Sequence, residues 1–207
     1  MTFDQLVHRA RTLAADGTRA LLGITGPPGA GKTTLAEQLI KALAPAPPSR
    51  LIPQQWVAHV PMDGFHLADQ ELTRLRRLDR KGAPDTFDPA GYAALLRRLR
   101  EDSDHVVYAP GFDRILEQPI AAAIPVPPSV RLIITEGNYL LFHQHDWDRV
   151  RPELDEIWYA DLDTAERIRR LIARHVQFGK EPGAAVAWAT GPDERNAVLV
   201  SSTRSRA

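Results

Sequence analysis

One eight-residue stretch near the N-terminus constrains this 207-residue chain more than any other. It runs from Gly26 to Thr33, reads Gly-Pro-Pro-Gly-Ala-Gly-Lys-Thr, and fits the phosphate-binding P-loop (Walker A) pattern G-x-x-x-x-G-K-[ST]. Glycines let such a loop turn tightly, so that its backbone N–H groups point inward at phosphate oxygens. Lys32 is placed to reach the β- and γ-phosphates, and the Thr33 hydroxyl to reach Mg²⁺. The motif therefore predicts binding of nucleotide phosphates.

The flanks of the loop match the setting that a true P-loop has. The apolar run 20–25 predicts a buried parallel strand before the loop, and the apolar spacing in 34–43 predicts a helix after it. That helix would add the positive end of its dipole to the phosphate site, whereas a chance match would need none of these features. The residues expected to hold the nucleotide are Gly26, Gly29, Ala30, Gly31, Lys32, Thr33 and Thr34.

Composition excludes several classes of protein. Twenty-six basic and 26 acidic residues leave no net charge, so nothing points to nucleic acid or an anionic membrane as a partner. The chain has no cysteine, which rules out disulfides and thiolate metal sites. It has neither the apolar core of a signal peptide nor a run long enough to span a bilayer. We expect a soluble, cytoplasmic protein with one domain over residues 1–207.

Hydrophobic periodicity and turn residues predict alternating strands and helices along the chain. Further buried strands are predicted at 56–60, 130–137 and 156–160. Helices are predicted at 2–15, 67–78, 88–102, 163–178, 182–188 and 193–200. The Pro-bounded segment 105–128 predicts a strand pair apart from the main sheet, which would form a small substrate-side subdomain.

Two acidic residues follow predicted strands. Asp63 lies after the strand 56–60, and ligands of open α/β sheets bind beyond the carboxyl ends of the strands. Asp63 could therefore accept a proton from an acceptor hydroxyl or help to hold Mg²⁺, although an aspartate before Gly64 equally suits a plain turn. Glu136 ends the strand 130–137, as the acid of a Walker B strand does, and could reach Mg²⁺ directly or through water. A solvent-facing carboxylate is the alternative for Glu136.

Basic and aromatic residues supply further candidates for the functional site, and each of them has two interpretations. Arg80 and Lys81 belong to a basic cluster that is either a solvated face or an anion contact. Arg170 and Arg174 are four residues apart on one helix face, which suits a lid that closes over phosphates or an ordinary charged helix. Phe112 either belongs to the core, which is the default, or stacks on a substrate.

Several fragments in this order resemble the phosphoribulokinase/uridine kinase superfamily of P-loop kinases. The fragments are 26–34, 62–66, 80–84 with 86–88, 110–114, 136–141 and the arginine-bearing helix 163–178. They are most similar to the bacterial nucleoside/nucleotide kinase-like branch, which is similar to type I pantothenate kinases and is sometimes labelled fructose-transport kinase. The ordered set is specific for the superfamily but not for the acceptor.

The resemblance implies a three-layer α/β/α fold with a mostly parallel sheet, an insertion at about 63–128 and a helical lid at about 163–192. It implies ATP and Mg²⁺ as cofactors, and transfer of the γ-phosphoryl group to a hydroxyl of a nucleoside, a pantothenate-like molecule or a sugar. The catalytic residues would be Lys32, Asp63, Arg170 and Arg174, and the metal-binding residues Thr33, Asp63 and Glu136. The acceptor candidates are His66, Arg80, Lys81, Phe112 and Arg114.

One departure from the resemblance concerns the end of the chain. Relatives usually have a further strand after the lid helices, beside the adenine site, but no apolar run follows residue 200 here. The fold could close differently, the chain could be short, or the sheet could have four core strands, so the adenine contacts stay open. A nucleotide-gated NTPase or regulator without an acceptor is the alternative function, and an inactive binding module is a third. The sequence does not fix the oligomeric state, for which a homodimer is a common outcome.

Overall fold

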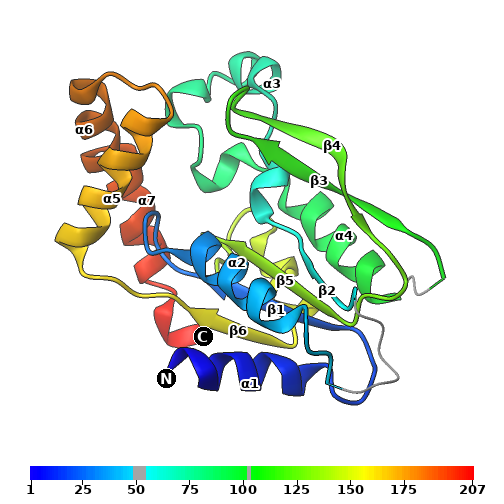
Figure 1. The fold of residues 1–207 in the computed structure, drawn as a ribbon. Coiled ribbons are helices and arrows are strands. Elements are labelled where there is room, and N and C mark those ends of the chain that lie inside the picture. The colour runs from blue at the N-terminus through cyan, green and yellow to red at the C-terminus, as the bar shows by residue number, and fades with distance from the viewer. Residues whose placement is uncertain (49–54, 102–103) are drawn as a thin grey trace.

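The computed structural model of the protein describes residues 1–48, 55–101 and 104–207 (Figure 1). The helices are α1 (Phe3–Leu13), α2 (Lys32–Leu43), α3 (Asp69–Arg74), α4 (Pro89–Glu101), α5 (Thr164–Gln177), α6 (Pro182–Thr190) and α7 (Pro192–Ser201). The strands are β1 (Ala20–Thr25), β2 (Val57–His59), β3 (Val107–Asp113), β4 (Gln118–Val126), β5 (Leu132–Gly137) and β6 (Glu156–Tyr159). The predicted extension of α4 to residue 102 lies outside the described residues.

The main sheet has the strand order β2-β5-β1-β6 with all neighbours parallel, and helices pack on both of its faces (Figure 1). On one face, α1 and α2 pack on β1 and β5 through an apolar cluster that includes Leu22, Leu39 and Ile134. On the other face, α4 packs through a second cluster that includes Leu21 and Leu96. The three-layer α/β/α fold with a parallel sheet is therefore confirmed.

Burial explains why the apolar runs form the two central strands. Every residue of β1 and β5 is buried, and both strands are apolar except for Thr25, Thr135 and Glu136 near their carboxyl ends. The strand predicted at 56–60 is shorter than expected, and its three residues are half-buried rather than buried. The reason is its position, because in the described part of the chain β2 pairs with β5 alone and lies at the sheet edge.

The residues predicted to begin helices at 88 and 163 do so in the structure. The Asp88 carboxylate accepts a hydrogen bond of 2.8 Å from the Gly91 N–H at the start of α4, and Asp163 caps α5 in the same way. The helix expected at 67–78 is wrong in length, because α3 covers six residues. Arg76 then adopts a left-handed conformation with φ of 56°, which is incompatible with continuing the helix.

The predicted strand pair forms the antiparallel hairpin β3–β4, a sheet of its own. It packs against the 3₁₀ turn Met62–Phe65 that follows β2. Contact is so close that a Cβ added to Gly64 would lie 2.4 Å from the carbonyl oxygen of Pro110. The hairpin is thereby held against the segment that carries Asp63.

Helices α5, α6 and α7 form a group beside the P-loop, and α7 leads to the C-terminus near β6 (Figure 1). Within the described residues the main sheet has four strands, and none follows the helices α5 to α7. Among the helices that the structure describes, none is both long and apolar enough to cross a membrane.

Candidate active site

The P-loop connects β1 to α2 in the conformation that its glycines allow. Gly26, Gly29 and Gly31 have φ values of 147°, 82° and 89°, which side-chain-bearing residues rarely adopt. A Cβ on Gly29 would lie 2.9 Å from the carbonyl oxygen of Arg167 and 2.8 Å from Leu171 Cγ. The loop therefore has the backbone curvature of a phosphate cradle, and α5 packs directly behind it.

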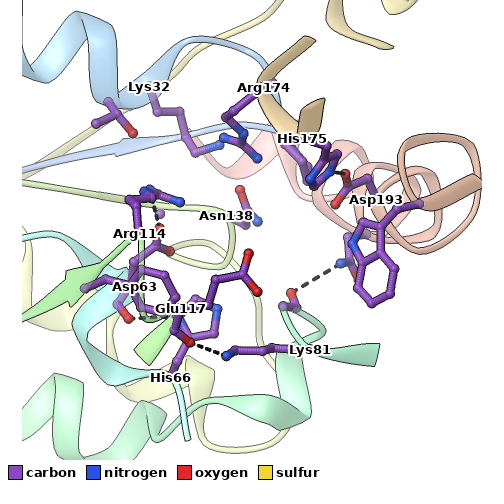
Figure 2. Close-up of a pocket in the computed structure, with 18 of the residues that line it drawn as sticks. Lys32, Asp63, His66, Lys81, Arg114, Glu117, Asn138, Arg174, His175 and Asp193 are labelled. Atoms are coloured by element: carbon purple, nitrogen blue, oxygen red, sulfur yellow. Dashed lines mark hydrogen bonds and ion pairs between the residues drawn. The ribbon is translucent and has the colours of Figure 1, made fainter. Parts of the chain in front are cut away.

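Two cavities meet at this loop. The first, which we call the main cavity, has a volume of about 170 Å³ and reaches from the P-loop to the β3–β4 hairpin and the α5–α7 group (Figure 2). The second, which we call the outer cavity, has a volume of about 270 Å³ and lies outside the loop, next to Thr34 and Arg170. The residues shared by both are Gly29, Lys32, Thr33, Arg114 and Arg174. Two ligands, one in each cavity, would therefore meet at these five residues.

Lys32 stands on this boundary and is 7% exposed. Its Nζ donates a hydrogen bond of 3.0 Å to the Pro27 carbonyl oxygen, which directs the ammonium group across the loop. Burial lowers the pKa of Lys32, although the nearby carboxylates of Glu136 and Asp63 act in the opposite direction. Negative charge entering the cavity would favour the ammonium form further.

Thr33 and Glu136 form an oxygen pair at the base of the cavity. The Thr33 hydroxyl donates to Glu136 Oε1 over 3.1 Å, and Glu136 is 4% exposed. Burial, followed by the charge of Asp63, raises the pKa of Glu136. A hydroxyl and a carboxylate are the ligands that Mg²⁺ accepts, so this pair fits the cation. No cluster of three metal-binding side chains occurs among the described residues, so phosphate and water oxygens would have to complete the shell.

Asp63 lies on the 3₁₀ turn after β2, at the strand end next to that of Glu136. Its Oδ2 accepts a hydrogen bond of 3.0 Å from the Arg114 guanidinium, and its backbone oxygen lies 2.8 Å from His66 Nδ1. Burial acts to raise the pKa of Asp63, but the positive groups of His66, Arg114 and Lys32 together outweigh it and the pKa is lowered. The carboxylate is therefore held in its ionised form.

The arginine helix α5 contributes to both cavities. Arg174 lines both of them, and burial together with the charge of Arg114 lowers its pKa. Arg170 lines only the outer cavity of the two, and its Nε lies 2.7 Å from Glu166 Oε1. Arg167, which no sequence motif singled out, is 3% exposed, donates to the Pro28 carbonyl oxygen over 3.3 Å and pairs with Glu194.

Four of the five acceptor candidates line the main cavity, namely His66, Lys81, Phe112 and Arg114. The Phe112 ring is not a core residue: the Arg114 guanidinium lies 5.5 Å and the Lys81 ammonium 5.8 Å from its centroid. The placement of Arg80 with them is wrong. It points into a different cavity, where it pairs with Asp85 at 2.8 Å.

Several residues of the main cavity were missed by the sequence analysis. These are Glu117, Asn138, His175, Lys180, Trp188, Asp193 and Asn196. His175 Nε2 lies 2.7 Å from Asp193 Oδ2 (Figure 2). The Asn196 amide donates to the Gly82 carbonyl oxygen over 3.2 Å. Asn138 lies in a fragment that carried the resemblance, but the residues of α6 and α7 have no local signal.

Arg167 gives a testable prediction about the loop. We expect Arg167→Leu to lower the melting temperature, because Glu194 and the Pro28 carbonyl lose their buried partner. Each kcal/mol of lost stability corresponds to a fall of about 2–4 °C in a protein of this size. Binding of ATP should weaken in parallel, since Arg167 supports the loop. Differential scanning fluorimetry and ATP titration would measure both effects. Arg169→Leu on the exposed side of α5 is the matched control, and an equal effect of the two variants would contradict the prediction.

Comparison with known proteins gives matches in both sequence and structure. A family model described as "Magnesium chelatase, subunit ChlI" matches residues 3–76, less than half of the chain, which includes the P-loop but not Glu136 or α5. A Schizosaccharomyces pombe protein named provisionally as uridine kinase C227.14 is 34% identical over 182 residues, which are 86% of this chain and 75% of the relative. The uncharacterized Escherichia coli protein YggC is 30% identical over 189 residues, 90% of this chain and 76% of its own.

Solved structures agree with these matches. A Silicibacter sp. TM1040 crystal structure, titled provisionally as a fructose transport system kinase, has a TM-score of 0.84 at 35% identity and covers 98% of this chain and 95% of its own. YFH7 of Saccharomyces cerevisiae, described as a P-loop kinase with a circular permutation, has a TM-score of 0.79. At 18% identity the YFH7 match supports the fold alone, with 98% of this chain and 96% of YFH7 covered.

Proposed function

The chain belongs to the P-loop kinases of the phosphoribulokinase/uridine kinase superfamily, and from this premise we propose that it transfers the γ-phosphoryl group of ATP to a hydroxyl of a small metabolite. The observation that carries the proposal is the boundary between the two cavities. Lys32 and Arg174 lie on that boundary. Asp63 lines the main cavity, whereas Thr34 and Arg170 line the outer cavity. ATP phosphates in the P-loop and an acceptor beside Asp63 would therefore meet at these two cations.

The charges at the boundary suit phosphoryl transfer. Asp63 would orient the acceptor hydroxyl and take its proton as the hydroxyl oxygen bonds to the γ-phosphorus. The bond between that phosphorus and the β–γ bridging oxygen breaks, and ADP leaves with the bridging oxygen. Lys32 and Arg174 would neutralise the charge on the phosphoryl oxygens in a site from which the closing helices exclude water.

Thr33 and Glu136 are the residues that would hold Mg²⁺ beside the phosphates, with the charge of Asp63 nearby. When bound, the cation supplies charge neutralisation for the β- and γ-phosphates. The protein's own part is to keep the hydroxyl and the carboxylate in place, which the 3.1 Å hydrogen bond between them supports.

The lining of the main cavity favours a small, polar acceptor of sugar size. Ligand sites for larger organic molecules are about 300–1,000 Å³ and predominantly apolar. This cavity is about 170 Å³, and most of the side chains at its acceptor end are charged or polar, among them Lys81, Glu117 and Lys180. A nucleoside would also need a free aromatic face, whereas the Trp188 ring already carries the Lys180 ammonium 4.9 Å from its centroid.

Coupled ADP release with a panel of acceptors would test the proposal. Uridine, pantothenate, D-fructose and D-ribose should be compared at equal concentration, and we expect ADP release to depend on an acceptor, with the sugars ahead of uridine. Uridine ahead of the sugars would overturn the preferred acceptor class. Rapid ATP turnover with no acceptor would instead favour the nucleotide-gated NTPase.

A further inference from the structure

His59 carries a buried polar atom that the proposed mechanism leaves unused. It is the last residue of β2, and its Nε2 has no hydrogen-bond partner among the described residues although the atom is shielded from solvent. Leaving such an atom unpaired is unfavourable relative to an apolar side chain in the same place. A histidine that served only to pack here would be replaced with benefit by a residue without that nitrogen.

The sheet register places His59 beside Glu136. His59 is opposite Ile134 on β5, and Glu136 is two residues further along the same strand. Side chains two residues apart in a strand point to the same face, which is the face that α2 covers. The distance from His59 Nε2 to Glu136 Oε1 is 3.9 Å, too long for a hydrogen bond but within reach of a small rotation of the carboxylate.

The same carboxylate oxygen has a second neighbour. Glu136 Oε1 accepts the hydrogen bond of 3.1 Å from the Thr33 hydroxyl. In the proposed function, Thr33 is also a ligand for Mg²⁺, which takes a lone pair of the hydroxyl oxygen and leaves the hydroxyl proton for Glu136. The ionised Glu136 carboxylate can accept further hydrogen bonds, and His59 is the neighbouring group whose Nε2 has no partner among the described residues.

The imidazole of His59 has the hydrogen-bonding groups that this role requires. A neutral imidazole has one N–H, which can be on Nε2 and donate to a carboxylate. It adds no positive charge that would repel a cation held by Glu136.

We propose that His59 is a positioning residue that donates a second hydrogen bond to the Glu136 carboxylate, beside that of Thr33, when the magnesium ion is bound. This inference rests on the proposed metal role of Glu136. It predicts that His59 acts on the affinity for the metal–nucleotide pair and not on the stability of the free protein. Partners that orient metal ligands in this way typically change metal affinity by about 10–100-fold when removed.

Three variants of the full chain would test it. His59→Phe removes the nitrogen and keeps the ring, His59→Gln keeps an N–H near the position of Nε2, and His8→Phe on the exposed side of α1 is the control. Titration with Mn²⁺ in the presence of ATP, followed by electron paramagnetic resonance, reports the metal directly. Metal-free ATP binding and the melting temperature without nucleotide should be measured on the same samples.

We expect His59→Phe to weaken Mn²⁺ binding about 10–100-fold, with metal-free ATP binding unchanged and the melting temperature equal or higher. His59→Gln should recover most of the affinity. Unchanged Mn²⁺ binding in His59→Phe, or equal losses in His59→Phe and His59→Gln, would overturn the inference. A lower melting temperature with a parallel loss of metal-free ATP binding would overturn it too, because it would indicate a packing role.

Glu136→Gln separates this inference from the proposed function. If Glu136→Gln binds Mn²⁺ as the unchanged protein does, then Glu136 has no metal role, and both that part of the proposed function and the inference fail. If Glu136→Gln loses affinity and His59→Phe does not, only the inference fails.

Discussion

Replacing Lys32 by alanine should lower kcat/KM for ATP by about 10²–10³-fold, the range seen when one preorganised charge-stabilising donor is removed. Lys32 is buried on the boundary of the two cavities, so its charge acts in a poorly solvated site where no water can substitute for it. ADP release at saturating acceptor would give the ratio, and titration with ATP would show how much of it is lost binding.

The control for this prediction is Lys41→Ala, which removes an exposed lysine from the last turn of the same helix. It should leave both ATP affinity and turnover unchanged. The melting temperature of Lys32→Ala should not fall, because burial of the ammonium group is unfavourable in the free protein. Turnover within about threefold of the unchanged protein would contradict the assignment of Lys32 to the phosphates.

Replacing Asp63 by asparagine should lower kcat by about 10²–10⁴-fold while ATP still binds, because asparagine keeps the shape of the side chain but cannot take a proton. The Arg114 guanidinium donates to Asp63 Oδ2, and within the described part of the chain Oδ1 is left for the acceptor hydroxyl. Rapid-quench measurement of phosphoryl transfer, alongside ATP titration, would separate the chemical step from binding.

Asp85→Asn is the matched control, since Asp85 is also paired with an arginine but lines a different cavity. It should cost a little stability and no phosphoryl transfer. If Asp63→Asn turned over normally, proton transfer would have to use another group, and Asp63 would keep only its contact with Arg114.

Sequence alone was sufficient where one short segment determines the structure. The P-loop, its flanking strand and helix, and the acids at the ends of β2 and β5 each follow from local pattern and from the geometry of parallel sheets. Their neighbourhood was predictable because the carboxyl ends of adjacent parallel strands lie at one edge. Which side chains then point into the cavity was predictable only in part.

Arg80 and Lys81 show the limit. The two residues are adjacent and equally basic, yet Lys81 enters the main cavity and Arg80 enters another. The 3₁₀ turn Leu78–Arg80 sets these directions, and no hydrophobic period marks so short an element. Asp193 and Asn196 were missed for a different reason, because only the packing of α7 on distant segments brings them to the site.

The attachment of α7 has a consequence for how the molecule tolerates shortening. Through Glu194 it holds the arginine that supports the P-loop, and through Asn196 it holds the Gly82 carbonyl on the opposite wall of the cavity. Helix α7 thus holds two walls of the cavity together. Removal of the chain from Pro192 onward would leave every P-loop residue in the sequence and still release both walls, so helix α7 is required for the shape of a site whose phosphate-binding loop lies far from it in the sequence.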